Sequence, residues 1–253
     1  MKNNNFDYRL LTQSYNNAET FIKMVSTGSF RSLIINGPPG IGKSVMTQKF
    51  LKKYNKATFR TISGHMTIMS LYDALYQHRG VGQVLVLDDV DSVFGKVEGL
   101  CLLKAAMDTQ QTNKVVWHSQ TSILNSLGIP PEFIFRGGVI LITNIGYGGS
   151  RVRMQSHLNA LKDRSYVIPI TDSGNPSEKF KQICFMVKKQ GLLNKYNLKD
   201  DEIDILLTWI EDHLEELLTV SLRTIIKLVE LYKNEQTQWK ELAFTALTKY
   251  GKE

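Results

Sequence analysis

The chain has 253 residues and a formal net charge of +7 at pH 7. This length can hold one large domain, or a medium and a small one, with a substantial buried core. No apolar run approaches the roughly 20 residues of a membrane span, and the polar first five residues lack the apolar core of a secretory signal, so we expect a cytoplasmic protein without a membrane partner. Cys101 and Cys184 fall in apolar helical patterns without metal-ligand spacing and predict buried, reduced thiols.

The charge is divided unevenly along the chain. Residues 1–170 carry a net charge of +9 and residues 171–253 one of −2, which suggests two bodies with different surfaces. A basic first part is compatible with nucleic acid, because neutralising phosphates supplies most non-specific affinity. It is equally compatible with a bound nucleotide and with ordinary solubility.

The first predicted elements are a helix over 16–26, a strand over 32–36 and a helix over 45–54. The last two flank a loop that fits the phosphate-binding pattern G-x-x-x-x-G-K-[ST] at every fixed position. Its residues are Gly37, Pro38, Pro39, Gly40, Ile41, Gly42, Lys43 and Ser44, and Val45 opens the helix. Inward-turned backbone N–H groups and the helix dipole would cradle phosphate oxygens. We expect Lys43 to contact the β- and γ-phosphates and Ser44 to bind Mg²⁺; the alternative is a Gly-rich surface turn.

A second motif follows a predicted strand over 57–62 and a helix over 67–78. The apolar run 84–87 predicts a strand buried on both faces of a parallel sheet, and Asp88 and Asp89 follow it. Such strand ends meet at the edge where open α/β sheets bind ligands. In this Walker B pattern Asp88 would hold Mg²⁺, mostly through water, and Asp89 would polarise the attacking water. Alternatively, the two acids cap the next helix.

Helical spacing over 99–108 and a short strand at 114–117 precede the apolar strand 139–144, which ends in Asn144. Asn144 could order the water near the γ-phosphate, or it could be only a turn former. A Gly-rich stretch over 145–150 and a helix over 152–161 lead to a strand over 165–170. Strands that alternate with helices in this way predict a parallel sheet with helices on both faces.

The composition changes at 171–176, a Thr-Asp-Ser-Gly-Asn-Pro linker. Four helices are predicted beyond it, over 177–190, 199–218, 222–233 and 236–249. We therefore predict an α/β domain over residues 1–171 and a small all-helical domain over 176–253. The second of these helices has eight acidic residues and no Lys or Arg between Asp200 and Glu216, which indicates either a solvated face or a docking surface for a partner.

In the order of these motifs the chain resembles the AAA+ ATPases over about residues 14–250. The phosphate loop matches Walker A, residues 84–89 match Walker B, and Asn144 matches sensor 1. The resemblance implies a five-stranded parallel P-loop sheet in the order 5-1-4-3-2, followed by a helical lid, with ATP and Mg²⁺ as cofactors. It also implies that Ser221, Leu222 and Arg223 form sensor 2, with Arg223 reaching the phosphates of its own subunit.

Arg164 lies where this family places its arginine finger. The resemblance implies that its guanidinium enters the site of a neighbouring subunit, where such a group raises the rate on the order of 10³–10⁵-fold. Hydrolysis then requires a homo-oligomeric ring, most often a hexamer. Arg151 and Arg153 are rival fingers. For Arg164 the alternatives are a surface ion pair with Asp163 and a phosphate-facing role in its own subunit, and for Arg223 the alternative is a solvated helix face.

Two departures from the family pattern bear on activity. The second Walker B acid is usually Glu, and Asp89 is one methylene shorter, which predicts slow hydrolysis because general-base geometry is tight. An Asp-Asp ending is similar to that of helicase loaders. Neither 64–66 (Gly-His-Met) nor 94–96 (Phe-Gly-Lys) is a clean match to the pore loop of unfolding members, which favours action on nucleic acid over polypeptide threading.

We therefore expect an ATPase that binds and hydrolyses Mg-ATP at subunit interfaces and acts on DNA or a DNA-bound replication complex, as a loader or remodeller. Its brevity is similar to that of small phage-encoded members, which would place it in a host cytoplasm. Three alternatives stay open: a chaperone that remodels a protein client, an ATP-binding structural subunit with little hydrolysis, and a small-molecule kinase.

Overall fold

The structure is a computed structural model that describes residues 6–54, 58–108, 113–117, 124, 126–144, 159–170 and 174–252, without the side chains of residues 91, 251 and 252. The chain separates into two compact units. Tyr15–Pro38 and Lys43–Ile170 form one, which we name the sheet unit. Met1–Ser14, Pro39–Gly42 and Thr171–Glu253 form the other, which we name the helical unit. Each is described by itself.

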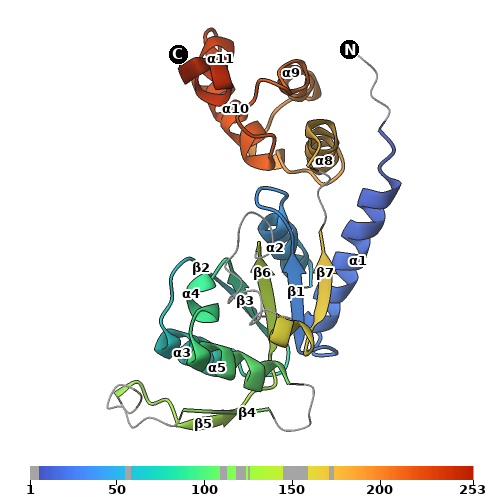
Figure 1. Cartoon of the computed structure of the whole chain (residues 1–253). Coiled ribbons are helices and arrows are strands. Elements are labelled where there is room, and N and C mark those ends of the chain that lie inside the picture. Colours follow the sequence, from blue (N-terminus) through green and yellow to red (C-terminus); the bar gives the residue numbers. More distant parts are fainter. Residues whose placement is uncertain are drawn as a thin grey trace. The chain divides into compact units, whose positions relative to one another are not determined.

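The sheet unit is built on five parallel strands (Figure 1). In space their order is β2-β3-β6-β1-β7, and their bounds are β1 Ser32–Asn36, β2 Thr58–Ser63, β3 Gln83–Asp88, β6 Gly138–Thr143 and β7 Tyr166–Pro169. Counted along these five strands alone, this is the order 2-3-4-1-5. It confirms the predicted order 5-1-4-3-2, read from the opposite edge of the sheet.

Helices cover both faces of this sheet. They are α1 Arg9–Ser26, whose residues from Tyr15 onward belong to the sheet unit, α2 Lys43–Lys53, α3 Ile68–Gln77, α4 Asp91–Phe94 and α5 Val97–Met107. Leu85, Leu87 and Leu141 share one buried cluster with residues of α3 and α5. Alternate strand residues point to the opposite face. There α1 packs closely, because a Cβ on Gly138 would lie 2.5 Å from Cγ1 of Val25.

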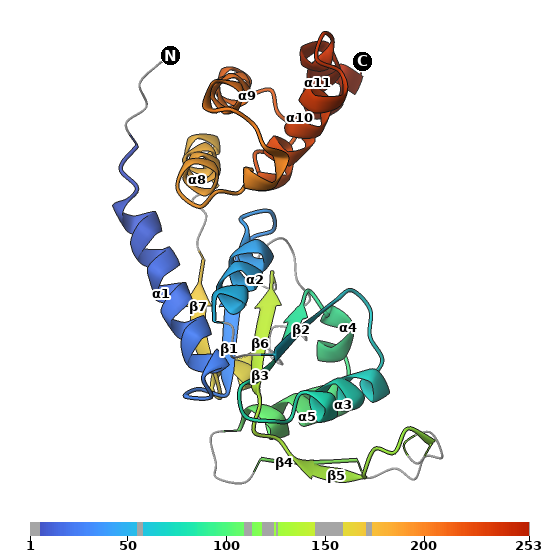
Figure 2. The same cartoon turned by 180° about the vertical axis from the view of Figure 1, so that it is seen from behind.

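A second, two-stranded antiparallel sheet joins β4 (Lys114–Val116) to β5 (Glu132–Ile134). Figures 1 and 2 both show this ribbon apart from the five parallel strands. The sequence predicted the first of these strands as a short one, outside the five strands of the main sheet, and it missed the second. A strand of three residues has too short a pattern to recognise, and β5 is held by pairing and by the ring of Phe133, 5.1 Å from that of Tyr72.

The helical unit contains α8 Pro176–Lys188, α9 Asp200–Asp212, α10 Leu222–Asn234 and α11 Trp239–Leu247, with short 3-10 turns at Asn194–Tyr196 and Lys249–Lys252. Asn175 begins α8 as a cap, since its Oδ1 accepts a hydrogen bond from the Ser177 N–H at 2.9 Å. The predicted second helix of this unit, 199–218, extends six residues too far at its C-terminal end. The chain leaves α9 after Asp212, and Leu217 bridges instead to Thr248.

The first helix begins earlier than its periodicity predicts, at Arg9 rather than residue 16. The segment before it is anchored within the helical unit, where the Phe6 ring lies 6.0 Å from Phe180 and the Tyr8 ring 5.7 Å from Phe185. These partners are 174 and 177 positions away in the sequence, so a local pattern could not reveal them. The predicted stretch 145–150 and most of the helix 152–161 lie outside the described residues.

Cys184 is buried as predicted, but the prediction of a buried Cys101 is wrong. Cys101 occupies the outer face of α5, whereas Leu100 and Leu103 face the core. Both thiols are free. In the part of the chain that the structure describes, no helix combines the length and the apolar character needed to cross a membrane.

Candidate functional site

The phosphate loop begins where β1 ends. Its first N–H, that of Gly37, donates to the carbonyl oxygen of Thr143 in β6 at 3.2 Å. Lys43 opens α2 with only 6% of its surface exposed. Its Nζ donates to the carbonyl oxygens of Gly37 and Pro38, both at 2.8 Å. The ammonium group is therefore folded back against the start of the loop.

The tip of the loop, Pro39–Gly42, belongs to the helical unit. Gly40 and Gly42 have φ angles of +78° and +93°, a region in which a side chain is strained. The Leu222 N–H donates to the Gly40 carbonyl oxygen at 3.0 Å, and Nε2 of Gln182 donates to that of Ile41, also at 3.0 Å. In a trans peptide the N–H points opposite to the preceding C=O. The N–H groups of Ile41 and Gly42 are thus directed away from Leu222 and Gln182.

The acidic strand end lies beside the start of the loop. β6 lies between β3 and β1, with Asp88 in register with Ile142 and Asn36 in register with Thr143. Neighbouring strands are about 4.8 Å apart, so the main chains at Asp88 and Asn36 are roughly 10 Å apart. Asn144 follows the last residue of β6 directly. The predicted residues Gly37, Asp88 and Asn144 are therefore brought to one edge of three adjacent strands.

Asp89 turns the chain sharply at this edge. Its φ is +53°, and its N–H donates to the carbonyl oxygen of Ile142 at 3.0 Å, while its side chain is exposed. Left-handed backbone costs a residue with a side chain about 1–2 kcal/mol, although Asp tolerates it better than most. Backbone strain of this kind gathers at functional sites.

Ser44 and Asp88 are the residues predicted to hold a metal ion. Both carry hard oxygen donors, which fit Mg²⁺, an ion that proteins usually hold through one or two carboxylates together with substrate phosphates. Ser44 is the second residue of α2, directly after Lys43, and Asp88 ends β3. The donor set is thus the right chemistry for Mg²⁺ bound with a nucleotide.

Two residues that adjoin one end or the tip of the phosphate loop escaped the sequence prediction. Asn36 directly precedes Gly37, the first residue of the phosphate loop. Its Oδ1 is buried and has no hydrogen-bond partner among the described residues. The signal in the sequence was a polar residue that ends an apolar strand. Gln182 gave no signal, because its contact with the Ile41 carbonyl joins residues 141 positions apart.

The predicted arginines take different places. Arg164 precedes β7, and its carbonyl oxygen accepts a hydrogen bond from Ser32, the first residue of β1, at 3.0 Å. Its Nη1 donates to the Ala160 carbonyl oxygen at 2.9 Å. It thus lies at the amino edge of the sheet, whereas the phosphate loop leaves the carboxyl edge. Arg223 is exposed in the first turn of α10, and the rival fingers, residues 151 and 153, lie outside the described residues.

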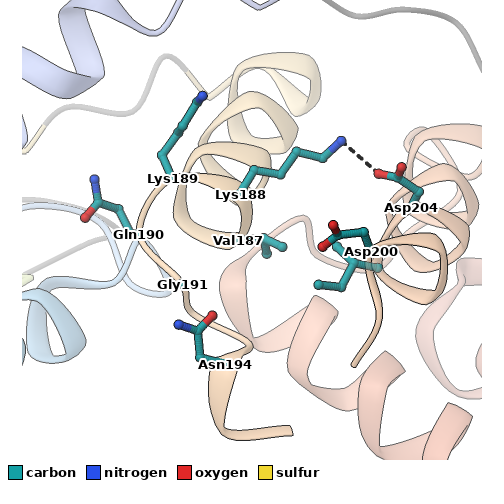
Figure 3. A pocket seen from close by; sticks show the side chains of 9 residues that line it. Val187, Lys188, Lys189, Gln190, Gly191, Asn194, Asp200 and Asp204 are labelled. Carbon is teal, nitrogen blue, oxygen red and sulfur yellow. Dashed lines mark ion pairs between the residues drawn. The ribbon is translucent and has the colours of Figure 1, made fainter. Parts of the chain in front are cut away.

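A cavity of about 640 Å³ lies in the helical unit, between the end of α8 and the start of α9 (Figure 3). Lys188 and Asp204 point toward one another across it, with Nζ and Oδ1 2.8 Å apart. Val187 and Ile203 add apolar surface to an otherwise polar lining. None of the residues predicted to bind nucleotide lines this cavity, so we do not place the candidate site there.

A parallel sheet with a phosphate loop after its first strand and an acid at the end of a nearby strand defines the class of P-loop nucleotide-binding proteins. The family model for the ATPase family associated with various cellular activities (AAA) matches residues 33–143. A protein of Enterobacteria phage T4, described as an uncharacterized 36.7 kDa protein in the nrdC-mobD intergenic region, is 34% identical over 225 residues, which are 87% of this chain and 69% of that protein. The chain belongs to the AAA family of ATPases.

Solved structures show the same fold. The Thermotoga maritima RuvB Holliday junction branch migration motor superposes with a TM-score of 0.50 at 14% identity, over 91% of this chain and 67% of that one. Its A156S mutant also gives 0.50, at 13% identity, over 92% of this chain and 66% of the mutant chain. At this identity the likeness concerns the fold alone.

Proposed function

We propose that the protein hydrolyses Mg-ATP at the subunit interfaces of a homo-oligomeric ring, a hexamer as in most of the family. The observation that carries the proposal is the meeting of the phosphate loop, Asp88 and Asn144 at one edge of three adjacent strands. Membership of an ATPase family supports the same reaction. The loop amides and Lys43 would hold the phosphates, with Ser44 and Asp88 as ligands of Mg²⁺, which neutralises phosphate charge when bound.

Hydrolysis itself is assigned to Asp89, with Asn144 orienting the attacking water. Asp89 is exposed at the strand end, so water can reach its carboxylate. Its side chain is one methylene shorter than the usual Glu. The φ of +53° changes the direction in which this side chain leaves the backbone. We expect slow turnover, because a general base must lie within hydrogen-bond reach of the water.

The finger is assigned to Arg164, acting in trans. The five residues of β1 span about 16 Å, and Arg164 lies at the far end of that strand from the phosphate loop. An arginine side chain cannot cover this length, which argues against a role at the phosphates of its own sheet. Arg223 would contact the phosphates from the same subunit.

We further propose that the protein acts on DNA or a DNA-bound replication complex, as a loader or remodeller. The net charge of +9 over residues 1–170 supports this, and phosphate neutralisation gives it a physical basis. A protein client bound through the acidic stretch 200–216 is the second candidate. Salt-sensitive binding of DNA favours the first, and ATP-dependent binding of a protein without DNA affinity favours the second.

We propose that the chain is divided along its sequence into an α/β domain, residues 1–171, and an all-helical domain, residues 176–253. The linker composition at 171–176 supports this division. Limited proteolysis should first cleave within this linker and release two stable fragments. First cleavage elsewhere would contradict these limits.

The test of the ATPase proposal follows specific activity against protein concentration. Activity should rise with assembly in the wild type, and Arg164→Ala should abolish the rise while nucleotide binding persists. Arg9→Ala is the matched control, because it removes only an exposed ion pair with Asp7. Full activity in Arg164→Ala would overturn the finger assignment, and unchanged nucleotide affinity in Lys43→Ala would overturn the site as a whole.

A further inference from the structure

Helices α1 and α2 lie side by side and are joined by packed rings, with the Tyr15 and Phe50 centroids 4.8 Å apart. Near this contact, several lysines of α1 and α2 are exposed on the surface. We use the name lysine seam for the group Glu19, Lys23, Lys49, Lys52, Lys53 and Tyr54. All of these residues belong to the sheet unit, and its four lysines are exposed.

The contacts within the lysine seam leave it strongly positive. Glu19 accepts hydrogen bonds from Lys53 Nζ and from the Tyr54 hydroxyl, the latter at 2.8 Å. Lys23 Nζ lies 5.8 Å from the centroid of the same Tyr54 ring. The lysine seam thus contains four lysines and one carboxylate, and that carboxylate already accepts two hydrogen bonds. On α2, Lys49, Lys52 and Lys53 are spaced by three and four residues and therefore share one helix face.

The electrostatics agree with this crowding. Partial burial lowers the pKa of Lys49, and the neighbouring charge of Lys53 lowers it further against the pull of Glu19. Burial would raise the pKa of Glu19, but the hydrogen bonds from Lys53 and Tyr54 bring it below its ordinary value. The surface therefore favours an added negative charge.

We propose that the lysine seam binds the sugar-phosphate backbone of a nucleic acid. Lysines are compact charges that neutralise phosphates without reading sequence, and each neutralised phosphate releases condensed counterions. The inference deepens the proposed function and rests on its claim that the protein acts on DNA. The lysine seam is then the surface of the protein that contacts DNA. α2 carries Lys43 at its first position and three of the seam lysines in its last two turns, so the two anion-binding regions are about 10–15 Å apart along one helix.

The chemistry of the surface favours nucleic acid over a protein partner or a membrane. A stable protein interface has an apolar centre, and an amphipathic helix that binds a membrane has an exposed apolar face. Among the described residues of α1 and α2, the exposed large apolar side chains are Leu10, Met24 and Val45. Leu10 belongs to the helical unit, Met24 is a single residue near the end of α1, and Val45 is near the opposite end of α2 from Lys52 and Lys53. They form no patch, whereas nucleic-acid interfaces are polar and positive.

The test measures binding of the full-length protein to a fluorescein-labelled 30-base-pair duplex by anisotropy, without nucleotide, between 50 and 300 mM salt. The seam variant carries Lys23→Gln, Lys49→Gln and Lys52→Gln, and it keeps Lys53 because that residue pairs with Glu19. The control carries Lys189→Gln, Lys195→Gln and Lys240→Gln, three exposed lysines of the helical unit, and so loses the same charge. Circular dichroism melting checks that both fold.

The slope of log affinity against log salt should fall by about 2–3 in the seam variant, since each duplex phosphate contact contributes about 0.9, and by less than 1 in the control. Arginine at the same three seam positions should restore the slope. Equal losses in both variants, or a wild type without duplex affinity at 50 mM salt, would overturn the inference. So would wild-type binding to phosphatidylserine vesicles but not to duplex, or loss of self-assembly in the seam variant with duplex affinity intact.

The ATPase assay separates this inference from the proposed function. Seam-dependent duplex binding by a protein without ATPase activity would overturn the proposed hydrolysis and support the seam. An active ATPase whose duplex affinity does not depend on the lysine seam would overturn the role of the seam and support the proposed hydrolysis.

Discussion

Gly40 offers the sharpest test of the loop geometry. Its φ is +78°, and a Cβ built on it would lie 2.9 Å from the Cβ of Ser221. Unlike the end of a long side chain, a serine Cβ is fixed to the backbone and cannot rotate away. Gly40→Ala must therefore either strain the loop or push α10 aside at its first turn.

The size of the effect follows from a matched pair of glycines. Gly64 has a similar φ of +85°, but a Cβ built on it meets no atom within 4 Å. Both substitutions carry the left-handed penalty of about 1–2 kcal/mol. Gly40→Ala adds overpacking, about 1–3 kcal/mol. If the loop must hold this conformation to bind nucleotide, the added cost weakens binding about 5- to 150-fold, at 1.4 kcal/mol per factor of ten.

The assay is titration of both variants with a fluorescent ATP analogue, alongside urea denaturation. Ser221→Gly removes the opposing Cβ and should restore most of the lost affinity in the Gly40→Ala background. Equal nucleotide affinity in Gly40→Ala and Gly64→Ala would contradict a role for the close approach to Ser221. Absence of rescue by Ser221→Gly would also contradict it, because the loss of affinity would then owe nothing to this contact.

The remaining predictions concern Asp89, the cysteines and Glu19. Asp89→Asn should bind ATP without hydrolysing it, and Asp89→Ala should in addition be about 1 kcal/mol less stable in urea, because alanine tolerates the φ of +53° less well; equal stability would contradict this. A thiol reagent at pH 8 should label exposed Cys101 rapidly but Cys184 only upon unfolding, since burial raises the pKa of Cys184 to about 12; rapid labelling of both would refute it. The pKa of Glu19 is lowered in the folded state, so its stabilisation exists above its ordinary value of 4.5 and is lost as the pH falls. The stability gap between the wild type and Glu19→Gln should therefore be larger at pH 7 than at pH 3.5, and a constant gap would show that the contact contributes no charge-dependent stability.

The local patterns predicted the main sheet well. Four apolar residues in a row at 84–87 and again at 139–142 have no polar face, so only a strand covered on both sides suits them. The phosphate loop and Asp88 were found for a related reason, since glycine spacing and a charge at a strand end are properties of adjacent residues. The order of the strands came from the family resemblance, and the structure confirms it.

What the sequence determined by itself was local: the strands of the main sheet, the phosphate loop, the acidic strand end and the change of composition near residue 171. The tertiary structure decided which distant groups meet. It placed β6 between β3 and β1, which brings Asp88 close to the loop, and it set Gln182 on the Ile41 carbonyl and α1 beside the lysines of α2. Such contacts join residues tens to more than a hundred positions apart, and no repeat along the chain encodes them. They arise because strands pair and apolar faces pack only when distant segments of the chain come together within a folded unit.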